Sequence, residues 1–120
     1  RHRRLPRLTV RFDFAGELSS LMIGVRQTTI FSRWHDELAD RRAAEIITKR
    51  LARLTRGLFG DMKKFGGIGE LRIDYGPGYR LYFARRGNEV IILLCGGTKG
   101  SQARDIARAQ DMLKEAFDGS

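Results

Sequence analysis

LRIDYGPGYRLYF, residues 71–83, determines the fold, because it contains two runs of alternating apolar and polar residues separated by a short turn. Successive side chains of a strand point to opposite faces of a sheet, and Gly76-Pro77-Gly78 supplies the residues that tight turns favour. The stretch therefore predicts a β-hairpin with one apolar face. The polar side chains share its other, open face and are Arg72, Asp74, Arg80 and Tyr82.

The sequence around the hairpin predicts further strands. The apolar run Val90–Cys95 is typical of a strand that is covered on both faces and is therefore central in its sheet. A shorter alternating segment lies near the start of the chain. The expected strands are Ile23–Thr28, Glu70–Tyr75, Tyr79–Arg85 and Glu89–Gly96.

Three segments have the apolar spacing of amphipathic helices. They are Ile30–Ala39 after a Thr29 cap, Arg41–Thr55 after an Asp40 cap, and Ser101–Phe117. Between the last two, residues 57–69 hold five glycines and predict a mobile, exposed loop. The order β-α-α-β-β-β-α indicates an α+β domain, in which a helical hairpin and a C-terminal helix pack on a small mixed sheet.

The chain divides at Met22. Residues 1–21 hold five arginines and show little periodicity, whereas a clean strand pattern begins after Met22. We interpret 1–21 as an added or upstream extension and 22–120 as the folded domain. The alternative for 1–21 is a basic arm that binds nucleic acid.

The charge balance favours a polyanionic partner. Lys and Arg number 23 against 14 Asp and Glu, which gives a net charge of +9 and a pI near 10.6. The longest apolar run is far shorter than the roughly 20 residues that cross a membrane. One cysteine, Cys95, allows no internal disulfide and fits the reducing cytoplasm. With only two histidines beside it, the sequence predicts no metal or other cofactor and no Ser-His-Asp triad.

The open face of the hairpin is the first candidate site. Arg72 and Arg80 are expected to be near cross-strand neighbours with Tyr82 beside them, and two adjacent guanidiniums repel each other unless an anion lies between them. A phosphate would suit this site, with Tyr82 stacking on a base. The alternative is that Arg72 forms a surface ion pair with Glu70 or Asp74, and the pattern does not decide between the two.

Two further segments could bind phosphate. CGGTKGSQ, residues 95–102, joins the apolar strand to a helix and carries Lys99, although it lacks the spacing of a Walker A loop. Lys63 and Lys64 lie in the glycine-rich segment before the hairpin. An ordinary connection and a solvated lysine pair are the respective alternatives. This inventory of Arg, Lys and Tyr suits cleavage of RNA through its own 2′-hydroxyl, because the substrate supplies the nucleophile.

Three stretches resemble the RelE/ParE superfamily of bacterial type II toxins, most closely its HigB-like branch of phage-derived addiction-module killer proteins. They are FSRWHDELAD (31–40), GELRIDYGPGYRLYF (69–83) and ILLCGGTKGSQARDIARA (92–109). The resemblance implies a compact RelE-like fold, a cognate antitoxin and cleavage of mRNA on the ribosome. The ParE branch shares the fold but inhibits DNA gyrase, so that activity remains an alternative, as does a non-catalytic module that binds nucleic acid.

The resemblance also implies roles for single residues. Arg80 follows Gly-Tyr as the arginine of RelE-type toxins does, and the family's tyrosine in the C-terminal segment has no match here. Tyr82 is the candidate substitute. The expected catalytic residues are Arg80, Arg72, Lys99 and Tyr82, and the expected RNA-binding residues are Lys63, Lys64 and Arg104.

Overall fold

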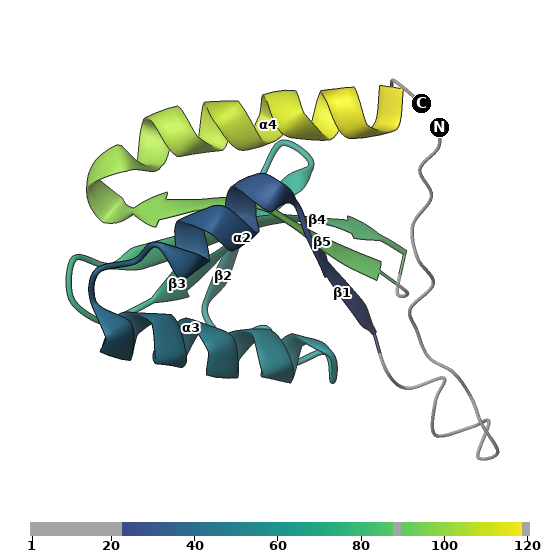
Figure 1. Cartoon of the computed structure of the whole chain (residues 1–120). Coiled ribbons are helices and arrows are strands. Elements are labelled where there is room, and N and C mark those ends of the chain that lie inside the picture. Colours follow the sequence, from purple (N-terminus) through teal and green to yellow (C-terminus); the bar gives the residue numbers. More distant parts are fainter. Residues whose placement is uncertain (1–22, 88–89, 119–120) are drawn as a thin grey trace, which may run out of the picture.

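The computed structural model describes residues 23–87 and 90–118. The prediction that 1–21 form an extension lies outside these residues. A five-stranded sheet forms the middle layer, with one long helix on one face and two helices on the other (Figure 1). The predicted α+β class and the mixed sheet are confirmed.

The sheet has the order β1-β5-β4-β3-β2, and its first pair, β1 with β5, is parallel while the others are antiparallel. Its strands are β1 (Gly24–Gln27), β2 (Met62–Phe65), β3 (Ile68–Ile73), β4 (Tyr79–Arg86) and β5 (Val90–Thr98). The interior position of β5 agrees with its apolar run. β3 and β4 form the hairpin that the alternating pattern predicts.

The helices are α2 (Thr29–Asp36), α3 (Arg41–Leu54) and α4 (Gln102–Asp118), and a short 3₁₀ turn, η1 (Lys99–Ser101), precedes α4. Asp40 caps α3 as predicted, because its carboxylate accepts from two backbone amides of the first turn. The cap of α2 is Thr28 and not the predicted Thr29, since the Thr28 hydroxyl accepts from the amide of Phe31. α2 also ends earlier than expected, at Asp36.

The prediction of a mobile loop over residues 57–69 is wrong for its central part. Met62–Phe65 form β2, an edge strand that pairs with β3. Gly66 and Gly67 both have positive φ and form the two-residue turn between these strands, a conformation that glycine adopts without steric cost. The glycines therefore close a tight hairpin.

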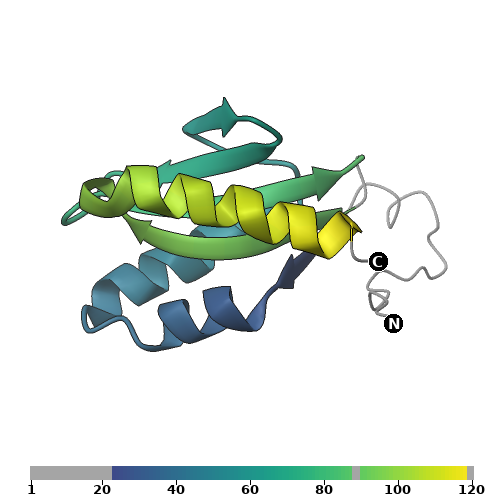
Figure 2. The same cartoon turned by 90° about the horizontal axis from the view of Figure 1, so that it is seen from above.

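The two faces of the sheet bury different side chains. The face toward α2 and α3 is apolar and centres on Leu71, Leu81 and Phe83. The opposite face packs against α4, which lies across it in Figure 2, and is apolar only in part. The expectation that this face of the hairpin is open is therefore wrong, because α4 covers much of it.

A bulge in β5 supports this arrangement. The pairing partners shift between Tyr82 and Phe83, so that β5 carries one extra residue, Leu94. Leu94 and Cys95 both pack on the α4 side as a result. Within the parts of the chain that the structure describes, no helix is both long and apolar enough to cross a membrane.

Candidate functional site

Arg72 and Arg80 lie directly opposite each other on β3 and β4. Paired residues of antiparallel strands share a face, so both side chains start from the face that α4 covers. The next strand places Gly97 opposite Arg80, and this residue has no side chain. The predicted cross-strand pairing of the two arginines is confirmed, and the pair lies near the end of the sheet where α4 begins.

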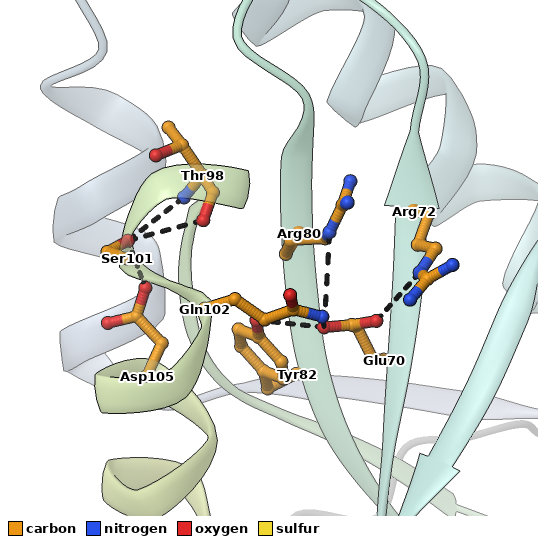
Figure 3. A network of polar contacts seen from close by, with 8 residues as sticks. All are labelled: Glu70, Arg72, Arg80, Tyr82, Thr98, Ser101, Gln102 and Asp105. Atoms are coloured by element: carbon orange, nitrogen blue, oxygen red, sulfur yellow. Dashed lines mark hydrogen bonds and ion pairs between the residues drawn. The ribbon is translucent and has the colours of Figure 1, made fainter.

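Glu70 lies beneath the arginines and is fully buried. Its Oε1 accepts a 2.8 Å hydrogen bond from Arg72 Nε. Its Oε2 accepts from the Tyr82 hydroxyl at 3.0 Å and from Gln102 Nε2 at 2.8 Å (Figure 3). Of the two open interpretations of Arg72, the ion pair with Glu70 is therefore present, although it joins a buried carboxylate and not a surface one.

These contacts determine the charge of Glu70. Burial alone would raise the pKa of its carboxyl, but hydrogen bonds from Arg72, Gln102 and Tyr82 outweigh burial and hold that pKa below its usual value. The hydrogen bond between Arg72 and Glu70 also raises the pKa of Arg72. Glu70 is thus an anion at neutral pH whose lone pairs already serve as acceptors.

Arg80 is 9% exposed, and its Nε lies 4.0 Å from Glu70 Oε2. That distance is too long for a hydrogen bond, and the buried Nε has no hydrogen-bond partner in the structure. Figure 3 shows the outer end of the guanidinium directed away from Glu70. Arg80 is therefore a cation near the surface whose Nε donor is not used in a hydrogen bond.

Tyr82 does not lie on an open face. Its side chain is fully buried, and its hydroxyl donates to Glu70. Burial and the bond to Glu70 both raise the pKa of the phenol. The expectation that Tyr82 stacks on a base or replaces the family's tyrosine rested on its exposure, and the position of α4 overturns that exposure.

Lys99 is the first residue of η1, which connects β5 to α4. Its amide donates to the Gly78 carbonyl at 2.7 Å, which ties η1 to the hairpin turn. A Cβ built on Gly78 would lie 3.4 Å from Arg80 Nη1 and 3.5 Å from the Cβ of Lys99. The structure therefore brings Lys99 to the same end of the sheet as Arg80, and its side chain is exposed.

The glycines of the connection have a different use from the one predicted. A Cβ on Gly96 would overlap the ring of Trp34, and one on Gly97 would overlap the carboxylate of Asp105. They make room for side chains of the protein itself. Asp105 accepts a 2.5 Å hydrogen bond from Ser101, which fixes the first turn of α4.

The three remaining candidates are spread out. Lys63 pairs with Glu70 across β2 and β3 and so lies on the arginine side of the edge strand, whereas Lys64 pairs with Gly69 and faces the α3 side. Both side chains are exposed. Arg104 is exposed on α4, where the buried positions are Asp105 and Ala109. Lys63 is thus the one member of this group that shares a face with the arginine pair.

The sequence reasoning missed Glu70 as a central residue and Gln102 altogether. Glu70 precedes Arg72 by two positions and therefore shares its face, which was a usable signal. Its burial was not predictable, because glutamate is almost never fully buried unless it is paired. Gln102 reaches Glu70 only because β5 and α4 place it there.

Chemically, the cluster can bind and stabilise a phosphate at the end of the sheet. The arginine pair supplies planar forks of donors and Lys99 adds a charge. Glu70 is a weak base, because its pKa is lowered and its oxygens already accept hydrogen bonds, and Tyr82 is not a base because its raised pKa keeps it a neutral phenol. No group of three metal-ligand side chains occurs among the described residues.

Comparison with known structures identifies the fold. A chain of the toxin–antitoxin complex RelBE2 from Mycobacterium tuberculosis matches 65% of this chain and 99% of its own length, with 20% identity and a TM-score of 0.54. The match confirms the predicted RelE-like fold. The conserved hypothetical protein HP0894 from Helicobacter pylori is a looser match, at 21% identity over 66% of this chain and 97% of its own, with a TM-score of 0.46.

Comparison of sequences identifies a relative. No protein-family model matches the chain. An uncharacterized protein from Haemophilus influenzae is 42% identical over 96 residues, which span 79% of this chain and 97% of that protein. The chain therefore belongs to the same family as this Haemophilus influenzae protein, and its fold is that of the RelBE2 chain.

Proposed function

We propose that this protein is the toxin of a type II toxin–antitoxin module, of the HigB-like branch, and that it cuts mRNA on the ribosome in the cytoplasm. The observation that carries the proposal is the register of β3 and β4, which sets Arg72 and Arg80 side by side at the end of the sheet where Lys99 also lies. The RelE-like fold and the positive charge of the chain support it.

In this mechanism the substrate supplies the nucleophile. The 2′-hydroxyl of a ribose loses its proton to solvent and its oxygen attacks the adjacent phosphorus. The bond to the 5′-oxygen breaks, this oxygen takes a proton from solvent, and a 2′,3′-cyclic phosphate remains. Arg80 stabilises the charge that develops on the phosphate oxygens, because the outer end of its guanidinium is directed away from Glu70 (Figure 3). Lys99 and Lys63 hold the flanking backbone from the two sides of the arginine pair. This chemistry draws no step from a metal or cofactor.

The proposed partner is an antitoxin with an acidic segment that covers the basic end of the sheet. The RelBE2 structure is itself a toxin–antitoxin complex. A net charge of +9 favours association with an acidic surface, and raised salt would slow that association.

One observation favours the gyrase alternative. Glu70 already neutralises part of the arginine pair, and the lowered pKa of Glu70 and the raised pKa of Tyr82 both make these groups poorly suited to act as a general base. A site of this kind could hold a partner without cutting it, as the ParE-like hypothesis and the non-catalytic nucleic-acid-binding hypothesis require.

The test compares wild-type protein with Arg80→Ala in cells. We expect wild-type induction to arrest growth and to produce new mRNA 5′ ends at ribosome-bound sites. Arg80→Ala should reduce cleavage ~10²–10³-fold, the usual effect of removing one transition-state donor. Arg53→Ala is the control, because Arg53 is exposed on α3, on the opposite face of the sheet, and has no part in the proposed site. If wild type and Arg80→Ala both arrest growth without new mRNA 5′ ends, and DNA supercoiling is inhibited, the nuclease proposal is wrong and inhibition of gyrase takes its place.

A further inference from the structure

We propose that Glu70 is a positioning residue that directs the Arg72 and Arg80 forks toward a phosphate, an inference that rests on the proposed function. Both arginines turn their Nε toward this one carboxylate. Arg72 Nε lies 2.8 Å from Oε1, and Arg80 Nε lies 4.0 Å from Oε2. When Nε faces inward, the two terminal nitrogens of each guanidinium are left for a ligand.

The carboxylate is itself held in place from the other side. Tyr82 and Gln102 both donate to Oε2, from β4 and from the first turn of α4. A chain of contacts therefore runs from α4 through Glu70 to the two arginines, as Figure 3 shows. Several hydrogen bonds that converge on one carboxylate hold it more firmly than a single bond would.

Arg80 is the looser member of this chain. Among the described residues, its buried Nε makes no hydrogen bond and its one ion pair is the 4.0 Å contact with Glu70. A small movement would bring Nε within hydrogen-bond distance of Oε2, so a phosphate on the outer nitrogens can tighten the contact with Glu70. Arg72, in contrast, is already bonded and serves as the fixed fork.

Glu70 also weakens resting phosphate binding, because its negative charge lies behind the two cations. Removal of that charge while the shape is kept should leave ground-state binding intact or tighten it, whereas the loss of orientation should reduce the catalysed step. Glu70→Gln removes the charge and keeps the shape. It should also loosen the two arginines, because the amide offers one acceptor oxygen to the four donors that face Glu70, which belong to Arg72, Arg80, Tyr82 and Gln102.

The first measurement does not depend on catalysis. Nitrogen–proton NMR follows the Nε signals of Arg72 and Arg80, assigned with single Arg→Lys variants, before and after addition of inorganic phosphate. In the wild type both should be dispersed and slow to exchange, and phosphate should shift the Arg80 signal most. In Glu70→Gln both should move to the position of exposed arginines. Glu45→Gln, an exposed carboxylate on α3, is the matched control and should change neither.

Gln102→Ala is the second variant, and it decides the matter if Glu70→Gln does not fold. It removes one donor to Oε2 and should partly release the Arg80 signal. An Arg80 signal that stays unchanged in whichever of these two variants is folded overturns the proposal.

The second measurement is single-turnover cleavage of ribosome-bound mRNA. Glu70→Gln should lower the maximal rate ~10-fold or more, with RNA binding unweakened, and Glu70→Asp should recover part of the rate. Equal losses in rate and binding would overturn the positioning role. If the wild type cuts no RNA, the nuclease proposal fails, and the NMR result alone decides the role of Glu70.

Discussion

The two faces of the sheet come from the same strands but are built on different principles. Toward α2 and α3, alternate residues of β3 and β4 bury only apolar side chains with one buried tyrosine, Tyr79. Toward α4, the same strands bury Glu70, Arg80 and Tyr82 beside a smaller apolar cluster. The first face provides the stability that lets the second hold charges close together, because burial of ions is costly unless they are paired. Stability and binding are thus divided between alternate residues of one hairpin.

Neighbouring residues 80 and 81 provide the strongest test of this division. Leu81→Ala leaves a cavity in the apolar face, where Leu81 is fully buried, and should reduce the free energy of unfolding by ~2–5 kcal/mol. Arg80→Ala should change the free energy of unfolding far less while it reduces RNA cleavage ~10²–10³-fold. Urea unfolding and single-turnover cleavage of both variants measure the two effects. Equal losses of stability would show that Arg80 belongs to the core.

Gly96 and Gly97 on β5 also face opposite sides of the sheet, Gly96 toward Trp34 of α2 and Gly97 toward Asp105 of α4. Neither has a positive φ, so an alanine at either position acts through its methyl group. Gly96→Ala pushes into Trp34 and should cost ~1–3 kcal/mol of stability with cleavage per folded molecule retained. Gly97→Ala pushes into Asp105 at the start of α4 and should displace Gln102 from Glu70 as well. Cleavage per folded molecule should therefore fall only in Gly97→Ala, and a loss in Gly96→Ala instead would reverse the assignment of the faces.

The hairpin, its register and the apolar face were predictable, because alternation alone specifies which side chains share a face. The sequence reasoning did not predict that α4 covers the other face of the hairpin, although the apolar stripe of α4 indicated that this helix needs an apolar partner. An amphipathic helix needs an apolar partner, and Ile106 and Ala109 find theirs in the cluster with Ile68 and Leu94.

Two further features had different causes. β2 was predicted as loop because glycines mark both hairpin turns and mobile segments, and only the pairing of Met62 with Leu71 distinguishes them. The β5 bulge at Leu94 leaves no mark in an uninterrupted apolar run. Of the candidate residues, sequence reasoning brought together Arg72, Arg80 and Lys99, and it could not foresee that a buried carboxylate joins the cluster.

The smallest expected effect separates the two faces by pH. Glu70 has a lowered pKa when folded, so its contribution to stability is present above the unfolded value, near 4.5, and is lost as the pH falls through the lower folded value. Tyr82→Phe removes one donor to Glu70 and should cost ~1.5 kcal/mol at pH 7, the lower end of the range for a hydrogen bond to a charged group. That cost should shrink as the pH falls through the folded pKa of Glu70, because a protonated Glu70 no longer benefits from the donor.

Tyr79→Phe is the matched control on the apolar face, where Tyr79 is 6% exposed and packs near Trp34. Its effect on the free energy of unfolding should not change as the pH is lowered from 7. Urea unfolding of the wild type and both variants at pH 7 and at a series of lower pH values gives the comparison. A Tyr82→Phe penalty that is independent of pH would mean that the hydroxyl contributes through packing alone. Glu70 would then be held by Arg72 and Gln102 without help from β4. Of the two donors to Oε2, only Gln102 of α4 would then help to position Glu70.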